Sequence, residues 1–436
     1  MKATNSKSQP NHGWTTALVG EEKTRPTKNF TLVAALLGLT LVLAPASTSA
    51  ITGKIIAQLS ATDSSPNSFF GAAIAISADG KTIAVAAPGA DTNNGIGEEV
   101  YVYEKPAGGW TDMTQFARLY SLDCPVTGAA GASIAITPDG STIVYQCNDI
   151  FGQAGDVGPI NVFIRPASGW QDGRPPNATF SVPGTGASAS LAIDPKGDTI
   201  ATTSTTFDPN TTIWTCFLYL FEKGAGWANN MAPTQTVSRV GTCAIAGPVA
   251  ITNDWVATTH TFGSLNLFRR SPIFGLLDAG SVNLDSDLVF MCCSVAMSES
   301  YIFASASGYL NGPNSALVSE VYVFSLPYDV IFPLAEVAQL FSPIKAYPPE
   351  VAASGRDVLF DVPGELPALF VEPFTGGWQT TSQPNLSLDV PTGFANVLYP
   401  PGSQYTLAIT GTVVVSGDEW AGRFHEGAAY VYRLKR

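Results

Sequence analysis

Few residues of this chain have the type and spacing that catalysis needs, and most of them fall in one short segment. Asp418, Glu419, His425 and Glu426 lie within nine consecutive positions. A histidine beside carboxylates could transfer protons in general acid–base catalysis. A charged segment of this kind is more often a solvated loop, and His260 is the only other histidine after residue 50. We therefore predict no catalytic residue and no enzymatic activity.

Two motifs associated with nucleotide binding and nucleophilic catalysis are incomplete. Gly80-Lys81-Thr82 has the end of a phosphate-binding loop, but Ala75 stands where that loop requires a glycine. The segment Gly131-Ala132-Ser133-Ile134-Ala135 lacks the second glycine of a nucleophile elbow. Neither motif supports an active site.

Oxygen-bearing side chains that suit calcium gather at Asp91, Asn93 and Asn94. Calcium takes about six to eight oxygen ligands in proteins, so these residues are candidate ligands. The alternative is an ordinary solvated turn. We expect no other cofactor.

The elements that would position these residues are short strands. Between Phe69 and Leu119, apolar runs are separated by the turn formers Asp79-Gly80, Pro88-Gly89 and Gly108-Gly109. Runs of this kind, without a helical period, predict an antiparallel meander of four strands. One such sheet cannot bury both of its faces alone, so a repeated unit is expected.

This unit recurs along the chain. Segments that end in a tryptophan after a Gly-containing turn occur at Trp110, Trp170, Trp227 and Trp378, with spacings of 60, 57 and 151 residues. The last spacing fits three units of about 50 residues, which makes seven units in all. Because the tryptophans recur at one structural position, we interpret them as packing residues and not as a ligand-binding stripe.

The two ends of the chain complement each other. The last unit stops after its third strand at Arg436, whereas residues 51–63 precede the first complete unit and resemble an isolated fourth strand. In a ring of radially repeated sheets, no strand edge is exposed if a strand from one end of the chain completes the blade formed by the other end. We therefore predict an all-β fold, a seven-bladed β-propeller of four-stranded antiparallel blades, closed by pairing of the N-terminal strand with the C-terminal blade.

The first unit resembles the FG-GAP repeat, the blade of integrin-α-like propellers and of many secreted bacterial proteins. The resemblance rests on Phe70-Gly71 and on Ala86-Ala87-Pro88-Gly89, and it weakens along residues 51–436. Members of this family often carry an Asp-rich calcium loop between the first and second strands of a blade. The corresponding turns here, such as Ser77-Ala78-Asp79-Gly80, depart from that pattern.

Six cysteines suit an oxidising compartment but do not prove that any disulfide forms. Their places in the repeats make Cys124 with Cys147, and Cys216 with Cys243, the candidate pairs. The alternative is that the cysteines are small buried residues.

Residues 1–50 differ from the rest of the chain. A basic segment is followed by the apolar run Phe30–Ala46 and by small residues that end at Ala50, a pattern typical of a secretory signal peptide. An uncleaved N-terminal anchor is the alternative. Either form predicts that the propeller, residues 51–436, is secreted or lies on the extracytoplasmic surface.

The charge of the propeller limits its partners. Residues 51–436 contain 17 basic and 33 acidic residues, a net charge of −16. This charge disfavours nucleic acids and anionic membranes. We expect a monomer with no membrane insertion beyond the N-terminal anchor.

Connections between second and third strands are long and differ from unit to unit, and recognition usually resides in such loops. Their expected ranges are Pro88 to Glu98, Asn148 to Pro159, Ser204 to Thr212, Ser307 to Ser319 and Gly417 to Gly427. The candidate ligand-binding residues on them are Trp420, Arg423, Phe424, His425, Phe151, Phe207 and Tyr309.

These features favour a non-catalytic module that binds an extracellular protein or glycan through one face. Two alternatives remain open. One is an extracellular polysaccharide hydrolase or lyase with acidic residues at the mouth of the channel, and the other is a structural surface protein.

Overall fold

The computed structural model describes most of residues 50–436 and none of residues 1–49, so the expected leader lies outside the described residues. Residues Ser49–Arg436 form a compact unit of their own. Within the described part, no helix is long and apolar enough to cross a membrane. The described ranges are 50–63, 65–90, 98–121, 130–149, 157–184, 190–241, 245, 247–260, 263–284, 288–291, 294–310, 317–327, 334–341, 350–361, 367–388, 406–418, 421 and 426–436.

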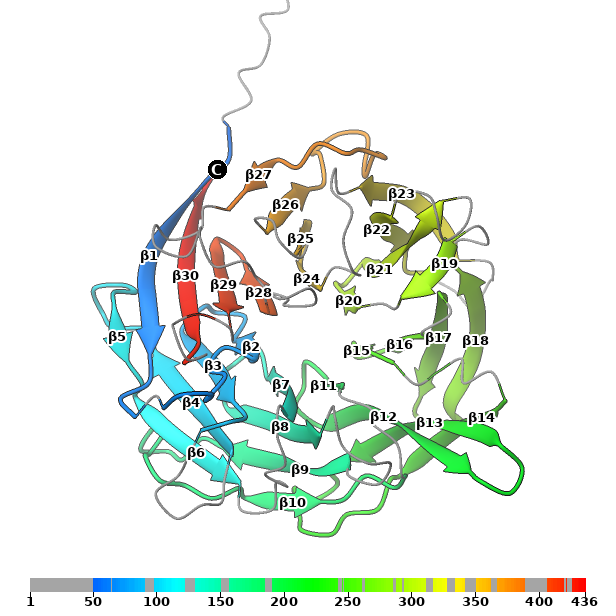
Figure 1. Ribbon diagram of the computed structural model, residues 1–436, viewed down its shortest axis with the longest axis horizontal. Helices are drawn as coiled ribbons and strands as arrows, with labels where there is room; N and C mark the ends of the chain where they lie inside the picture. Colours follow the sequence, from blue (N-terminus) through cyan, green and yellow to red (C-terminus); the bar gives the residue numbers. More distant parts are fainter. Residues whose placement is uncertain are drawn as a thin grey trace, which may run out of the picture. The chain divides into compact units, whose positions relative to one another are not determined.

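Seven antiparallel sheets are arranged around a common centre, and the first strand of each lies innermost (Figure 1). Blade 1 consists of β2 (Ala73–Ile76), β3 (Thr82–Ala87), β4 (Glu98–Glu104) and β6 (Ala117–Ser121). Blade 2 consists of β7 (Ala130–Ile136), β8 (Thr142–Asp149), β9 (Val157–Ile164) and β10 (Ala178–Phe180). Blade 3 consists of β11 (Leu191–Ile193), β12 (Thr199–Asp208), β13 (Ile213–Glu222) and β14 (Gln235–Val240).

The second half of the ring repeats this order. Blade 4 consists of β15 (Val249–Ile251), β16 (Trp255–His260), β17 (Ser264–Ser271) and β18 (Gly275–Asn283). Blade 5 consists of β20 (Val295–Met297), β21 (Tyr301–Leu310), β22 (Leu317–Ser325) and β23 (Ala335–Phe341), with β19 (Leu288–Met291) also paired to β21. Blade 6 consists of β24 (Val351–Ser354), β25 (Asp357–Phe360), β26 (Ala368–Val371) and β27 (Leu386–Ser387).

Blade 7 takes its fourth strand from the other end of the domain. It consists of β28 (Thr406–Thr410), β29 (Val413–Asp418), β30 (Ala428–Lys435) and β1 (Thr52–Ser60). Strand β1 pairs antiparallel with β30, from Thr52 opposite Lys435 to Leu59 opposite Ala429. On its other side, β1 pairs with β5 (Met113–Thr114), which leads into blade 1. The predicted seven blades and the predicted strand pairing are both present.

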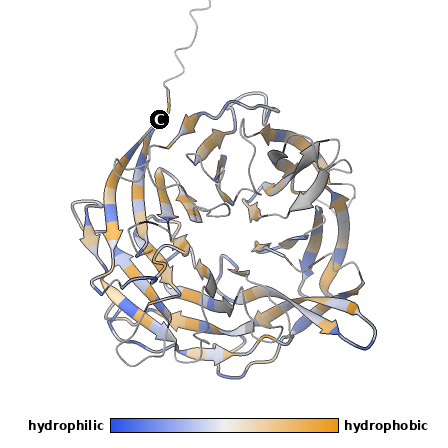
Figure 2. Ribbon diagram, viewed as in Figure 1, coloured by the Kyte–Doolittle hydropathy of each residue, from blue (hydrophilic) through white to orange (hydrophobic). Residues whose placement is uncertain are grey.

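The first strands converge where the ring is narrowest, and each contacts the next around the whole ring, including β28 with β2. A small side chain stands at the middle of every first strand, where seven strands approach one another. Apolar residues (orange) occupy strands all around the ring (Figure 2). The seven central residues are Ala75, Ala135, Ala192, Ala250, Ala296, Ala352 and Ala408.

The residue two positions before the central alanine of the first strand links neighbouring blades. Ser133, Ser190 and Ser294 each accept a hydrogen bond through Oγ from a backbone N–H of the next blade, at 3.0, 2.9 and 3.3 Å. Glu350 Oε1 accepts a hydrogen bond from the Leu407 N–H of blade 7 at 3.5 Å. The Thr406 hydroxyl of blade 7 donates to the Gly71 carbonyl of blade 1 at 2.6 Å. In blades 1 and 4 this position is Ala73 or Pro248, and neither side chain can make such a bond.

The four hairpin tryptophans are buried between blades. Each lies in a hydrophobic cluster formed by its own blade and the preceding one, which confirms the packing interpretation. The Trp110 indole also donates a hydrogen bond to the Gly80 carbonyl at 3.2 Å.

The contact between blades 4 and 5 has a different tryptophan. The segment between the third and fourth strands of blade 5 contains no tryptophan. Trp255, the first residue of β16 in blade 4, is buried in the cluster that these two blades share. The Arg269 guanidinium carbon lies 5.9 Å from the centre of the Trp255 ring. Sequence reasoning missed this residue because it comes from a different strand of the repeat.

Both halves of the motif, Phe70-Gly71 and Ala86-Ala87-Pro88-Gly89, have a packing role at the start of blade 1. The buried Phe70 ring contacts Tyr101 edge-on at 5.4 Å between ring centroids. Phe70 also bridges to Gly427 of blade 7, where a Cβ would lie 1.9 Å from the Phe70 carbonyl oxygen. A Cβ at Gly89 would lie 1.9 Å from the Asn67 carbonyl oxygen. Only glycine permits these approaches of one backbone to another.

Candidate binding surface at the loop end

The two ends of the ring differ in their connections. Because the strands of each blade alternate in direction, the connections between second and third strands all lie at one end, which we call the loop end. The turns between first and second strands, and between third and fourth strands, lie at the other end, which we call the hairpin end.

Most of the predicted site residues lie outside the described residues. These are Phe151, Trp420, Arg423, Phe424 and His425, together with the calcium candidates Asp91, Asn93 and Asn94. Tyr309 lies in β21, paired with Val289 and Leu317. Within the described part, no group of three or more His, Cys, Asp or Glu residues could hold a metal ion.

Several of the expected loops are shorter than predicted. Residues 148–149, 204–208, 307–310 and 417–418 continue second strands, and residues 157–159 and 317–319 begin third strands. In these places pairing with the neighbouring strand extends the ladder. In blade 3 the connection is only residues 209–212.

The hairpin formed by β12 and β13 has the longest described ladder between second and third strands. It continues for ten residue pairs, from Thr199 opposite Glu222 to Asp208 opposite Ile213. The equivalent ladders of blades 1 and 4 have six pairs each from the same starting register. The Asp208 carboxylate accepts hydrogen bonds from the Asn210 N–H and the Thr211 hydroxyl, which fixes the turn. We call residues 206–215 with Val240 the blade-3 hairpin.

Both faces of the blade-3 hairpin are apolar. Phe207 lies opposite Trp214 on one face, with ring centroids 4.8 Å apart. Ile213 and Val240 lie on the other face, because side chains alternate along a strand and Val240 pairs with Thr215. Trp214 is 42 % exposed, Ile213 41 % and Val240 69 %. Of these residues, only Phe207 was a candidate from the sequence.

A disulfide lies at the base of this hairpin. Cys216 is buried and disulfide-bonded, on the same face of β13 as Trp214. Cys124 and Cys243 lie outside the described residues, and Cys147 lies in β8 opposite Ala132. Cys216 is thus part of a disulfide, while its pairing with Cys243 stays a prediction.

A network of ionisable groups lies where blade 1 meets the end of β1. The Tyr101 hydroxyl is 2.5 Å from Glu99 Oε2 and 3.0 Å from Asp63 Oδ1, and it donates to these acceptors. Arg118 pairs with both Asp63 and Asp172. Burial raises the pKa of the Glu99 carboxyl, and the hydrogen bond from Tyr101 acts in the opposite direction. Glu99 is only 4 % exposed, whereas the side chains of Arg118, Asp63 and Asp172 are 35 %, 34 % and 57 % exposed.

Acidic residues lie at the loop end. Among the described residues there, Asp63, Asp208, Glu350 and Glu426 are at least partly exposed, whereas Glu99, Glu320, Asp361 and Asp418 are buried.

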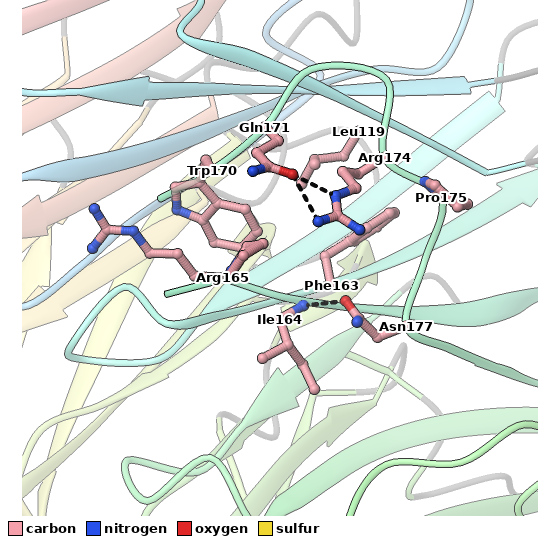
Figure 3. Close-up of a pocket in the computed structure, with 10 residues that line it drawn as sticks. Leu119, Phe163, Ile164, Arg165, Trp170, Gln171, Arg174, Pro175 and Asn177 are labelled. Carbon is pink, nitrogen blue, oxygen red and sulfur yellow. Dashed lines mark hydrogen bonds between the residues drawn. The ribbon is translucent and has the colours of Figure 1, made fainter. Parts of the chain in front are cut away.

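A pocket of about 240 Å³ lies at the hairpin end, between blades 1 and 2 (Figure 3). Gln171 Oε1 accepts hydrogen bonds from Arg174 Nε at 3.0 Å and Nη2 at 2.7 Å, and Asn177 Oδ1 accepts one from the Ile164 N–H. Its remaining lining residues are Leu119, Phe163, Arg165, Pro166, Trp170 and Pro175. None of the lining residues is Asp, Glu, His or Cys, so the pocket offers no usual general acid or base.

Comparison with solved structures found propellers of low similarity. The periplasmic gluconolactonase PpgL of Pseudomonas aeruginosa is 13 % identical, with a TM-score of 0.43, and the match covers 73 % of this chain and 84 % of that one. The Cps50 (Swd1) β-propeller domain of Myceliophteria thermophila is 11 % identical, with a TM-score of 0.47 and coverage of 82 % and 96 %. The Pan2 WD40 domain of Neurospora crassa is 10 % identical, with a TM-score of 0.46 and coverage of 87 % and 95 %.

A search of curated proteins found no match. Residues 55–103, however, match the FG-GAP repeat family. This range begins within β1 and ends within β4, so it contains both halves of the motif that packs blade 1 against blade 7. The chain is therefore a seven-bladed β-propeller whose first unit matches the FG-GAP repeat.

Proposed function

We propose that this protein is a non-catalytic binding module outside the cytoplasm that recognises a partner protein through the blade-3 hairpin. The observation that carries the proposal is the exposure of Trp214 on one face of this hairpin and of Ile213 and Val240 on the other. Tryptophan is among the residue types that dominate binding energy at protein interfaces. A partner that contacts both faces would bury all of this apolar surface.

The chemistry of the hairpin favours a protein over a glycan. Sugars present hydroxyl groups on their edges, and burying these groups without hydrogen-bond partners is costly. Ile213 and Val240 are aliphatic and offer no such partners, whereas they suit the apolar core of a protein interface.

The charge of the loop end predicts the charge of the partner. Asp63, Asp208, Glu350 and Glu426 are at least partly exposed at this end. A partner with a basic rim would be attracted to this end and oriented by it, and salt would weaken that attraction. An anionic polysaccharide would be repelled.

Two observations support a location outside the cytoplasm. Cys216 is disulfide-bonded, and disulfides persist mainly in oxidising compartments. The sequence of residues 1–50 also has the pattern of a secretory signal or an N-terminal anchor.

Binding assays with a hairpin variant test this function. The immobilised propeller is offered extracellular proteins and a glycan array, as wild type and as the Ile213→Ser/Trp214→Ser/Val240→Ser variant. The variant should lose a protein captured by the wild type, with affinity reduced at least about 30-fold for a contact of hot-spot strength.

The matched control is Phe116→Ser/Val337→Ser, which removes two other exposed apolar side chains and should leave capture unchanged. Capture that survives in the hairpin variant would overturn the proposed surface. Binding to glycans alone, or cleavage of a polysaccharide by the purified protein, would instead support one of the alternative functions.

A further inference from the structure

Apolar side chains also project from the hairpin end, on turns that the core does not need. Ile273 and Phe274 occupy the turn between β17 and β18 of blade 4 and are 81 % and 75 % exposed. Phe374 lies in the segment between β26 and β27 of blade 6 and is 95 % exposed. The equivalent turns of blades 1 to 3 contain small residues, as in Pro106-Ala107-Gly108-Gly109.

The topology places these turns at one end of the ring. Strands β17 and β26 are the third strands of their blades, so both run toward the hairpin end. Strand β30 is the third strand of blade 7, and its last residue, Lys435, pairs with Thr52. The chain therefore enters the propeller at the same end from which Ile273, Phe274 and Phe374 project.

The sequence before that point is apolar. Phe30–Ala46 contains 17 residues without a charge and ends shortly before Thr52. If the segment is kept as an N-terminal anchor, it tethers the propeller at its hairpin end. The three exposed side chains are then on the end that faces the bilayer.

We propose that Ile273, Phe274 and Phe374 insert into the surface of a lipid bilayer and hold the hairpin end against it. The side chains stand on two blades separated by blade 5, whose corresponding turn lies outside the described residues. A bilayer receives separate apolar insertions at any spacing, whereas a protein partner needs one continuous complementary surface. The loop end, with its binding hairpin, then faces away from the membrane.

A cationic side chain lies beside one of the three apolar residues. The Arg356 guanidinium carbon lies 4.7 Å from the centre of the Phe374 ring and also pairs with Glu372. An arginine beside an inserted aromatic ring can reach lipid headgroups while its stem stays in apolar surroundings.

Vesicle flotation tests the contact directly. The compact unit from residue 50 onward, which lacks the apolar leader, is mixed with phosphatidylcholine vesicles. The wild type should float with the vesicles, and Ile273→Ser/Phe274→Ser/Phe374→Ser should bind at least about tenfold more weakly because three apolar side chains no longer leave water. The control Phe116→Ser/Val240→Ser should float like the wild type.

A second measurement locates the inserted residue. In Phe374→Trp, the new tryptophan should be quenched by bromine-labelled lipid chains, whereas the tryptophan of Phe116→Trp should not. Equal flotation of all variants, or no quenching of Phe374→Trp, would overturn the proposal. A wild-type dimer that the triple variant converts to monomer, without any flotation, would also overturn it. This proposal does not depend on the function of the blade-3 hairpin, whose variant is expected to float normally.

Discussion

Two contacts between neighbouring blades are filled by different residues. Where blade 7 meets blade 1, Phe70 and Trp110 fill the core, Gly427 admits the Phe70 backbone, and Thr406 bonds across. Where blade 4 meets blade 5, Pro248 makes no equivalent bond, and Trp255 fills the core from the preceding blade. We call these the 7/1 contact and the 4/5 contact.

The difference shows which parts of the repeat the fold requires. Both contacts keep a central alanine in the first strand and a large aromatic ring between the blades. The motif residues that make blade 1 recognisable are one way to supply that ring. At the 4/5 contact Trp255 supplies that ring from a second strand instead of from the hairpin of blade 5.

The largest expected effect is at the 7/1 contact. Deleting residues 51–59 removes nearly all of β1, which exposes β30 as an unpaired edge and opens blade 7. The product should aggregate, and circular dichroism on heating should show no cooperative unfolding. A soluble deletion variant that unfolds cooperatively would show that the ring does not need this strand.

Replacing the tryptophan at each contact tests whether the two are equivalent. Trp110→Ala and Trp255→Ala each remove a buried indole, and each should lower the free energy of unfolding by about 3–5 kcal/mol. Urea denaturation measures both. A loss below about 1 kcal/mol for Trp255→Ala would mean that Trp255 is not the substitute for the missing hairpin tryptophan.

A smaller effect is expected from the close backbone approach at the 7/1 contact. Gly427 has a φ of 80°, and a Cβ there would meet the Phe70 carbonyl, so Gly427→Ala should cost at least about 2–3 kcal/mol. Gly226→Ala is the matched control, because no atom lies within 4 Å of its Cβ position. Equal stabilities of the two variants in urea would contradict the account of the motif.

The smallest effect depends on pH and concerns the Glu99 network beside the 7/1 contact. Burial raises the pKa of the Glu99 carboxyl in the folded chain, so its stabilising contribution is present below the unfolded pKa of about 4.3 and is lost as pH rises through the folded value. Glu99→Gln should therefore have a higher melting temperature than the wild type at pH 7.5. The corresponding gain in the free energy of unfolding should be no more than about 1 kcal/mol.

At pH 4 the two melting temperatures should converge. The exposed Glu222→Gln is the control and should show no such pH dependence. A stabilisation by Glu99→Gln that is equal at both pH values would show that charge burial is not its cause.

The repeat could be predicted from the sequence because its signal is local. Alternating apolar runs and Asp-Gly turns determine the strands, and the isolated strand at residues 51–59 has a natural partner in the incomplete last blade. Trp255 could not be assigned, because only the packed structure shows which strand fills a contact between blades. The β12–β13 extension was missed because the sequence does not show how far the pairing between two strands continues beyond their apolar core segments.

The candidate site was predicted less well for a physical reason. Exposure decides whether an aromatic residue can bind a partner, and the sequence does not report exposure. Trp214 stands in an apolar strand segment that reads as core, yet its position near the end of a long ladder leaves it open to solvent. Ile273 and Phe274 differ from core residues only in the turn that carries them.

The seven alanines at the centre have a consequence for the number of blades. Strands that converge on a common axis can approach only as closely as their side chains allow, and bulkier residues would force a wider circle. A wider circle of first strands would leave space for an additional blade. Because every unit contributes the same methyl group at this position, all seven first strands can approach the centre equally closely, which suits a ring of seven blades.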